Sequence, residues 1–430
     1  MTELPPGWTE TTLSEIAEIR LGRQRSPKNH QGENMVPYLR AANVTWDGLK
    51  LDDVKEMNFT PDEVETYALR RGDIVVAEAS GSQSEVGKPA MWKENLPVCC
   101  IQNTLLRVRT HGADPAFVLH LLAHEARSGR LGDASRGVGI HHIGKARLAA
   151  WPVWLPPLPE QHRIVEAIEE RFTRLDAAEA LLRRALKMTN RLGQSAVAHA
   201  ISGDWPSVTV GSVSVLQEYG SSAKASADGE VAMIRMGNIQ DGLLDWNSLK
   251  YLPEAHPDAH RYRLAPGDLL FNRTNSPELV GKSAVYQGGP LDACFASYLI
   301  RLRFNAEALP EWVCHQLNGP GGRRWASHAR TQQVGQANIN GTKLSTFEFP
   351  LPPIDVQRRT VQALEDDLST VRNLRSQLER SIAQVAHLRR SILERAFTGE
   401  LATHNPEDES LEMKTASSDS PPSSRRKVSS

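Results

Sequence analysis

Three short stretches carry residue types that could do chemistry. GSQSEVGK, which ends at Lys88, superficially resembles a phosphate-binding loop, but its glycine spacing is wrong and a proline replaces the required hydroxyl residue. Asp73 and Glu78 could act as paired nuclease carboxylates, and His141 with His142 could bind a metal ion. No GxSxG, HExxH or GxGxxG motif occurs in the sequence, nor does the NPPY-type loop of an adenine methyltransferase. These stretches are therefore weak candidates for a catalytic site.

An internal repeat provides a control for each of these candidates. Leu155–Gly203 returns as Leu351–Gly399, offset by 196 positions, and VPYLRAANV returns as VAMIRMGNI, offset by 195. Offsets that drift by only one or two residues across the chain indicate a tandem duplication. Arg273 replaces Glu78 in the second copy, and Ala337-Asn338 replaces the histidine pair. Because a shared catalytic role should survive in both copies, we predict no catalytic or metal site in this chain.

Each copy does contain a basic, glycine-rich segment just before its long helix. EARSGRLGDASRGVGIHHIGKAR is the first, and GPGGRRWASHARTQQVGQANINGTK is the second. Glycine allows the backbone to approach a phosphate, while Arg, Gln, Asn and His can hydrogen-bond to base edges. A flexible solvated loop is the alternative interpretation. A further basic cluster, LGRQRSPKNH, lies near the N-terminus. The DNA-contact candidates are Arg23, Arg25, Lys88, Arg136, His141, Lys145, Arg273, Lys282, Arg330, Gln332, Gln336 and Asn338.

Long helices must position these segments. Each follows a Leu-Pro-Pro hinge, which ends the preceding strand, and each is followed by a glycine that is typical of a helix C-terminus. Apolar residues at heptad spacing predict a seam that meets another helix, with Arg375 and Arg389 interrupting a second row. Packing of each helix on its own domain is the alternative. The predicted seam residues are Ile168, Leu175, Leu182, Leu364, Val371, Leu378, Val385 and Ile392.

The length of 430 residues favours two or more domains. A formal net charge of −1 means that any DNA-binding surface is local, and we expect the isolated chain to bind DNA weakly. Without CxxC spacing, the four cysteines read as reduced core residues. No apolar run is long enough to span a membrane and no signal peptide is evident, so we expect a cytoplasmic protein.

Between the repeats, short alternating or apolar runs mix with short helical stretches, which predicts an α+β fold for each domain. The C-terminal tail, residues 403–430, is rich in Ser, Pro, Glu and Lys, and we expect it to be disordered. The predicted boundaries are residues 1–154 for the first domain, 155–205 for the central helix, 206–350 for the second domain, 351–402 for the C-terminal helix and 403–430 for the tail.

The order of these motifs resembles the specificity subunit of type I restriction–modification enzymes. RAANVTWDG and RMGNIQDG, VGIHHI and VGQANI, LPPLPEQHRIVEAIE and LPPIDVQRRTVQALE, and AISG and AFTGEL carry the resemblance across nearly the whole chain. The second copy departs from the family pattern at one point: the Pro-Glu-Gln that follows the first hinge is replaced by Asp-Val-Gln, beginning at Asp355, after the second hinge. The resemblance implies two target recognition domains, which alternate with two helices paired as an antiparallel coiled coil.

The resemblance also implies that this chain is non-catalytic and has no cofactor of its own. It would bind a bipartite double-stranded DNA target and dock two methyltransferase subunits, which restriction–translocase subunits then join. S-adenosylmethionine, ATP and magnesium would act in those partners. Two rivals stay open at this point: a self-contained nuclease or methyltransferase with duplicated domains, and a helical scaffold that does not bind DNA.

Overall fold

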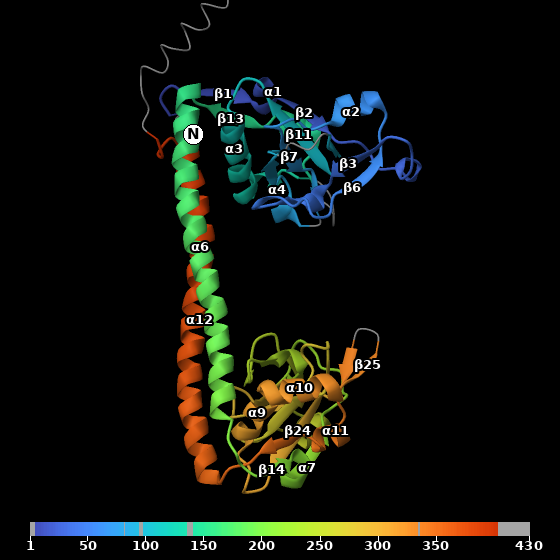
Figure 1. Ribbon diagram of the computed structural model, residues 1–430, viewed down its shortest axis with the longest axis vertical. Coiled ribbons are helices and arrows are strands. Elements are labelled where there is room, and N and C mark those ends of the chain that lie inside the picture. Colours follow the sequence, from blue (N-terminus) through green and yellow to red (C-terminus); the bar gives the residue numbers. More distant parts are fainter. Residues whose placement is uncertain (1–4, 81, 94–97, 136–140, 334–335, 403–430) are drawn as a thin grey trace, which may run out of the picture. The chain divides into compact units, whose positions relative to one another are not determined.

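The computed structural model describes residues 5–80, 82–93, 98–135, 141–333 and 336–402, without the side chains of residues 84, 332 and 333. The chain divides into two units (Figure 1). Unit 1 combines Met1–Leu181 with Ser381–Ser430, and unit 2 is Leu182–Arg380. The division falls inside both long helices, α6 (Leu158–Ala200) and α12 (Ile354–Phe397), so each unit holds one domain and a segment of each helix. The predicted tail, residues 403–430, lies outside the described residues.

The domain of unit 1 mixes small sheets with short helices. Its strands are β1 (Thr9–Thr12), β2 (Ala17–Leu21), β3 (Met35–Leu39), β4 (Val44–Thr45), β5 (Gly48–Leu49), β6 (Lys55–Asn58), β7 (Ile74–Ala77), β8 (Ala79–Ser80), β9 (Pro89–Met91), β10 (Cys100–Ile101), β11 (Leu105–Thr110), β12 (His141–His142) and β13 (Pro152–Leu155). Its α- and 3-10 helices are α1 (Leu13–Ile16), η1 (Pro27–Asn29), η2 (Ala41–Asn43), α2 (Pro61–Tyr67), η3 (Gln83–Glu85), α3 (Pro115–Arg127), α4 (Arg130–Asp133) and α5 (Lys145–Ala149). The larger sheets have the orders β2-β11-β7-β9 and β10-β3-β6, and β10 pairs with β3 in parallel.

The domain of unit 2 repeats this arrangement. Its strands are β14 (Ser207–Thr209), β15 (Ser214–Tyr219), β16 (Val231–Ile234), β17 (Ile239–Gln240), β18 (Leu243–Leu244), β19 (Lys250–Leu252), β20 (Leu269–Asn272), β21 (Thr274–Asn275), β22 (Ser283–Val285), β23 (Ala293–Phe295), β24 (Leu299–Phe304), β25 (Thr331–Gln333), β26 (Gln336–Asn338) and β27 (Glu348–Pro350). Its helices are α7 (Val210–Val213), η4 (Met236–Asn238), α8 (Pro257–Arg261), α9 (Pro310–Asn318), α10 (Pro320–Ala329) and α11 (Gly341–Ser345). The sheet orders β15-β24-β20-β22 and β19-β16-β23 correspond strand by strand to those of unit 1.

A buried glutamine fixes the start of each long helix. Gln161 accepts a hydrogen bond from the backbone N–H of Asp114 (2.8 Å) and donates one to the carbonyl of Pro156 (2.8 Å). Gln357 makes the equivalent bonds in unit 2, where Leu309 supplies the N–H (2.8 Å). Asp114 and Leu309 are the N-caps of α3 and α9. Because a buried amide without partners would be costly, these bonds tie each hinge to its own domain.

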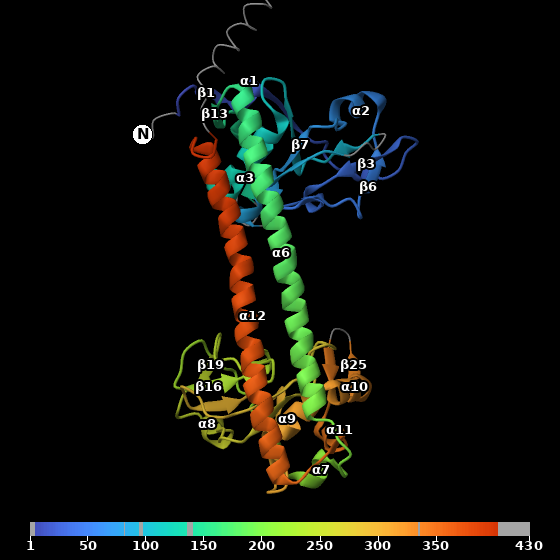
Figure 2. The same cartoon turned by 60° about the vertical axis from the view of Figure 1, so that its left-hand side comes forward.

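In unit 1, α6 and α12 lie side by side and run in opposite directions (Figure 1, Figure 2). Ile168 shares a buried cluster with Leu393 and Phe397 of α12. Further along α6, the guanidinium of Arg389 lies over the ring of Phe172, with 5.5 Å between the guanidinium carbon and the ring centroid. Residues further along α6 therefore contact residues that come earlier in α12, which shows that the two helices are antiparallel.

The helix pair of unit 2 is also antiparallel. A Cβ placed on Gly193 of α6 would lie 3.3 Å from the side chain of Val371 and 3.8 Å from that of Leu368. Nearer the end of α6, Val197 packs against a core cluster that includes Val361. Among the predicted seam residues, Ile168, Leu364 and Val385 are buried, and Leu175, Leu182, Val371, Leu378 and Ile392 are half-buried.

The long helices also complete the cores of their domains. Ile164 and Ile168 of α6 and Ala396 of α12 belong to the same cluster as Leu13 and Phe117 of the first domain. The two arrangements weighed from the sequence thus coexist, because one side chain such as Ile168 faces both the helix pair and the domain. Among the described residues, no helix combines the length and apolar character needed to cross a membrane.

Candidate nucleic-acid interface

The predicted recognition segment of unit 1 ends in a short ladder at the edge of the domain. His141 of β12 pairs with Ser80 of β8, and His142 pairs with Ala79. Nδ1 of His142 lies 3.0 Å from Oε2 of Glu78, the residue that links β7 to β8. This ladder places the polar end of the segment beside a strand that continues from the buried four-stranded sheet.

Unit 2 places its segment in the same way. Asn338 of β26 pairs with Thr274 of β21, and its Nδ2 donates a hydrogen bond to the Thr274 hydroxyl (2.8 Å). β25 pairs with the other side of β26 and extends the ladder. Both copies therefore share a backbone arrangement, while the side chains that it presents differ.

A cation at equivalent positions holds the base of each segment. Arg147 of α5 donates a hydrogen bond to the carbonyl of Ala134, which follows α4. Lys343 of α11 donates to the carbonyl of Ala329 at the end of α10 (2.7 Å) and to the hydroxyl of Thr331 (3.0 Å). Each cation also satisfies a carbonyl at a helix C-terminus. These two basic residues position the segments from within their domains.

The RAAN and RMGN motifs position a hairpin next to each segment. In unit 1 the side chain of Asn43 accepts from the backbone N–H of Arg40 (3.1 Å) and donates to the carbonyl of Lys50 (2.9 Å). Asn238 makes the corresponding bonds with Arg235 and Asp245. Both asparagines are buried, so they brace the hairpins β4–β5 and β17–β18 and do not face a ligand.

Asp73, one of the possible nuclease carboxylates, belongs to a buried structural ion pair. Its carboxylate accepts two hydrogen bonds from Arg109, both 2.7 Å long. Asp268 pairs with Arg303 at the equivalent place in unit 2. Within the part of the chain that the structure describes, His, Cys, Asp and Glu side chains form no cluster of three that could hold a metal ion.

The predicted DNA contacts of unit 1 fall into two groups. Lys88 and the half-buried His141 lie near the ladder, and Lys145 is exposed at the start of α5. Arg23 lies elsewhere: it pairs with Glu63 (2.7 Å) and its guanidinium lies over the ring of Phe59. Arg25 is exposed in the loop that follows Arg23. Arg136 lies outside the described residues.

Several predicted contacts of unit 2 already have partners within the domain. Arg330 donates to the carbonyl of Pro277 (2.6 Å), and Arg273 donates to that of Ser297 (3.2 Å). Lys282 donates to Oε1 of Gln240 (3.2 Å). Gln336 is exposed and Asn338 half-buried in the ladder. The side chain of Gln332 lies outside the described residues.

Sequence reasoning missed a cluster in unit 1, which we call the Trp46 cluster and which consists of Trp46, Glu85, Lys88 and Arg127. Nε1 of Trp46 donates to Oε1 of Glu85 (3.0 Å), Lys88 pairs with the same carboxylate, and the guanidinium of Arg127 lies 4.2 Å from the Trp46 ring centroid. Burial alone would raise the pKa of Glu85, but the hydrogen bonds from Lys88 and Trp46 lower it below its ordinary value. Lys88 was a predicted DNA contact and Arg127 lies in the predicted basic segment, but no sequence pattern joined either residue to Trp46 and Glu85.

A family model matches this chain twice. The model is the type I restriction modification DNA specificity domain, and it matches residues 5–185 and 203–383. The specificity subunit of the type I restriction enzyme EcoKI of Escherichia coli (strain K12) is 26% identical over 427 residues, which cover 93% of this chain and 90% of that protein. The StySPI specificity subunit of Salmonella potsdam is 25% identical over 423 residues, with the same shares.

Solved structures share the fold. One is a chain described under "Structural basis underlying complex assembly and conformational transition of the type I R-M system". It is 23% identical to this chain and has a TM-score of 0.71, and the match covers 93% of this chain and 100% of that chain. The HsdS subunit from Thermoanaerobacter tengcongensis has a TM-score of 0.50 and 23% identity, covering 93% and 98%.

The chain belongs to the family of type I restriction–modification DNA specificity proteins. It is a DNA-recognition subunit, built from two tandem specificity domains with long helices, so the resemblance and the fold class predicted from the sequence are confirmed. The self-contained enzyme and the scaffold without DNA binding are not favoured.

Proposed function

We propose that each domain reads one half of a bipartite double-stranded DNA target through the major groove. The observation that carries this proposal is the matched ladder of the two units, β8–β12 and β21–β26, which presents different polar side chains on one backbone design. Two domains with the same framework and different side chains suit two different half-sites. Backbone contacts to phosphate would set the register, and the ladder side chains would contact base edges.

The long helices would dock two methyltransferase subunits. In unit 2, α6 exposes Met188 (60%) and Leu192 (58%), and in unit 1 it exposes Leu181 (67%). None of these side chains belongs to the predicted seam. Large apolar side chains that stay exposed after the helices have paired support a protein partner on the outer face of α6.

Catalysis would take place in the partner subunits. The methyltransferase subunits would transfer a methyl group from S-adenosylmethionine to adenine, and restriction–translocase subunits would use ATP and magnesium to cleave DNA. This chain would choose the site and position the DNA, and it would work in the cytoplasm, where the DNA and the cofactors are.

Methylation mapping of the native genome, with and without this chain, tests the proposal. We expect a bipartite methylated motif that disappears when the chain is deleted. The complex with methyltransferase subunits should bind that motif in preference to other DNA, and added salt should weaken the binding. Methylation or cleavage by the purified chain alone would contradict the proposal, as would a partner complex without sequence preference.

A further inference from the structure

A small cavity in unit 1 lies between η2, the turn that leads into the hairpin β4–β5, and the recognition ladder. It has a volume of about 370 Å³, and Ala41, Ala42, Ala77 and Ala79 line it together with polar residues. Its polar groups come from Ser80, Glu85 and Lys88. Ala79 and Ser80 are the residues of β8 that pair with β12, so the cavity adjoins the end of the predicted recognition segment.

The Glu85 carboxylate is held in one position at this cavity. Nε1 of Trp46 donates to one carboxylate oxygen and the Lys88 ammonium donates to the other. The Arg127 guanidinium lies over the Trp46 ring, 4.2 Å from its centroid, and helps to fix the ring. Each carboxylate oxygen can accept more than one hydrogen bond, and the Glu85 side chain is 38% exposed. An approaching donor can therefore reach an oriented acceptor.

The surroundings of Glu85 suit a base edge. In the major groove the exocyclic amino groups of cytosine and adenine are donors, and Glu or Asp is a suitable acceptor for the cytosine amino group. A carboxylate near DNA would normally be repelled by the phosphates. Lys88 and Arg127 supply positive charge beside Glu85 and offset that repulsion. The alanine methyl groups leave room for a flat base edge and add no competing donor.

Unit 2 lacks this arrangement at the same place in its repeat. Leu279 stands where unit 1 has Glu85, and Asn272 stands where unit 1 has Ala77. The hairpin position of Trp46 is taken by Asp241, which pairs with Arg375 of α12 (2.6 Å). The second domain therefore cannot make, at this place, the contact that we infer for unit 1. This difference would help the two domains read different half-sites.

We propose that Glu85 is a specificity-determining residue of unit 1, whose carboxylate accepts a hydrogen bond from the exocyclic amino group of one base in the half-site of that domain. Trp46 and Lys88 are positioning residues for this contact. The inference rests on the proposed function, because it requires the first domain to read one half of the target.

Methylation mapping of a strain that carries Glu85→Gln tests the assignment with the complete complex. Gln keeps the size of the side chain but replaces one acceptor oxygen with a donor. We expect one position of one half-site, a cytosine or adenine contact in the wild type, to lose its base preference, while the other half-site and the spacer stay unchanged. Leu279→Gln is the matched control, and it should leave the half-site of unit 1 unchanged.

Base analogues identify the amino group. Complexes assembled with wild-type chain are titrated with duplexes in which 2-pyrimidinone replaces a cytosine or purine replaces an adenine, one position at a time. Removal of the contacted amino group should weaken binding by about 5- to 150-fold, the range of one good base contact. The Glu85→Gln complex should lose much less from the same replacement, and Glu85→Asp serves if the Gln variant does not assemble.

The outcomes separate the two proposals. An unchanged motif in the Glu85→Gln strain, or equal losses for the wild-type and variant complexes on every analogue, would overturn the role of Glu85 and leave the DNA-reading function intact. Absence of a bipartite motif in the wild-type strain would instead overturn the proposed function itself.

Discussion

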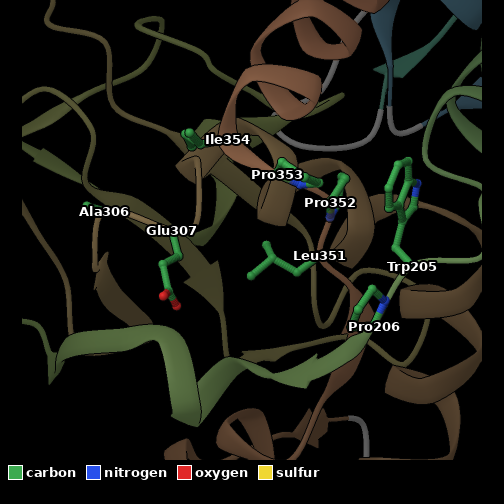
Figure 3. A pocket seen from close by; sticks show the side chains of 8 residues that line it. All are labelled: Trp205, Pro206, Ala306, Glu307, Leu351, Pro352, Pro353 and Ile354. Atoms are coloured by element: carbon green, nitrogen blue, oxygen red, sulfur yellow. The ribbon is translucent and has the colours of Figure 1, made fainter.

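At the scale of single residues, one difference between the repeats changes how the hinges are held. Trp8 is 6% exposed, and its Nε1 donates to Oε1 of the buried Glu160 (2.9 Å). At the equivalent positions of unit 2, Trp205 is 38% exposed and Val356 replaces the glutamate. Trp205 instead lines an open cavity of about 500 Å³, together with Leu351 and the two hinge prolines that follow it (Figure 3). The change from Pro-Glu-Gln to Asp-Val-Gln, visible in the sequence, thus removes an acceptor and retains the glutamine.

Trp8→Phe should therefore destabilise unit 1 more than Trp205→Phe destabilises unit 2. The first change leaves a buried carboxylate without one donor, which typically costs about 1–3 kcal/mol, whereas a partly exposed aromatic swap costs about 0.5 kcal/mol or less. Hydrogen exchange under increasing denaturant, followed in α3 and α9, measures the two units separately. Equal losses in both variants would show that the Trp8–Glu160 hydrogen bond contributes nothing.

Two histidines of α3 are buried against the long helices of unit 1, and we expect them to make this unit sensitive to acid. His120 packs edge-on against Phe172 of α6, and His124 packs against Phe397 of α12. Burial lowers the pKa of each histidine from 6.5 to about 4, with smaller effects from Lys93 on His120 and Arg130 on His124. In the unfolded chain both titrate near 6.5, so as the pH falls below 6.5 the unfolded state takes up protons first.

We therefore expect unit 1 to lose stability as the pH falls from about 6.5 to about 4, by at most about 3 kcal/mol for each histidine. α9 provides the internal control. In α9, Nε2 of His315 lies 2.9 Å from Oε1 of Glu365, and this hydrogen bond lowers the pKa of Glu365. The ionised Glu365 therefore stabilises the fold above pH 4.5, and this stabilisation is lost only as the pH falls below 4.5. Between pH 6.5 and 5, hydrogen exchange should accelerate in α3 and not in α9. Parallel acceleration in both helices would contradict this assignment.

At the scale of elements, the long helices pair differently in the two units. Gly193 and Arg389 occupy equivalent positions of the repeat. Gly193 lets Leu368 and Val371 approach α6 in unit 2, whereas Arg389 reaches over Phe172 and pairs with acidic residues of α6 in unit 1. The arginines that interrupt the heptad pattern are therefore contact residues, which heptad spacing alone does not reveal.

Arg389→Ala should loosen the helix pair of unit 1. It removes the contact with Phe172 and the ion pairs with Asp176 and Glu179, which together should contribute about 1–2 kcal/mol. Arg390→Ala, at an exposed neighbouring position, is the control and should change stability by about 0.5 kcal/mol or less. Thermal unfolding at low and high salt measures both. An Arg389 effect that does not shrink in salt would assign the loss to packing and not to charge.

At the scale of the whole molecule, duplication made the architecture predictable from the sequence. Two copies of every hinge and heptad pattern predicted two α+β domains and two long helices, because repeated spacing survives changes in individual side chains. The base-contact candidates were harder to predict. Residue type does not reveal which basic side chains also hold their own domain together, as Arg330 does through the Pro277 carbonyl. The Trp46 cluster depends on side chains from a hairpin, a loop and a helix that are far apart in the sequence.

If the helix pair sets the separation of the half-sites, a matched insertion should change the spacer and nothing else. Seven residues added near Ala185 in α6 and seven near Arg380 in α12 preserve the heptad register and add about 10 Å of helix, comparable to about three base pairs. Methylation mapping should show both half-sites unchanged and a spacer longer by a few base pairs. The same seven residues inserted after position 410 should leave the motif as it is, and altered half-sites in the helix variant would show that the helices do not act as a spacer.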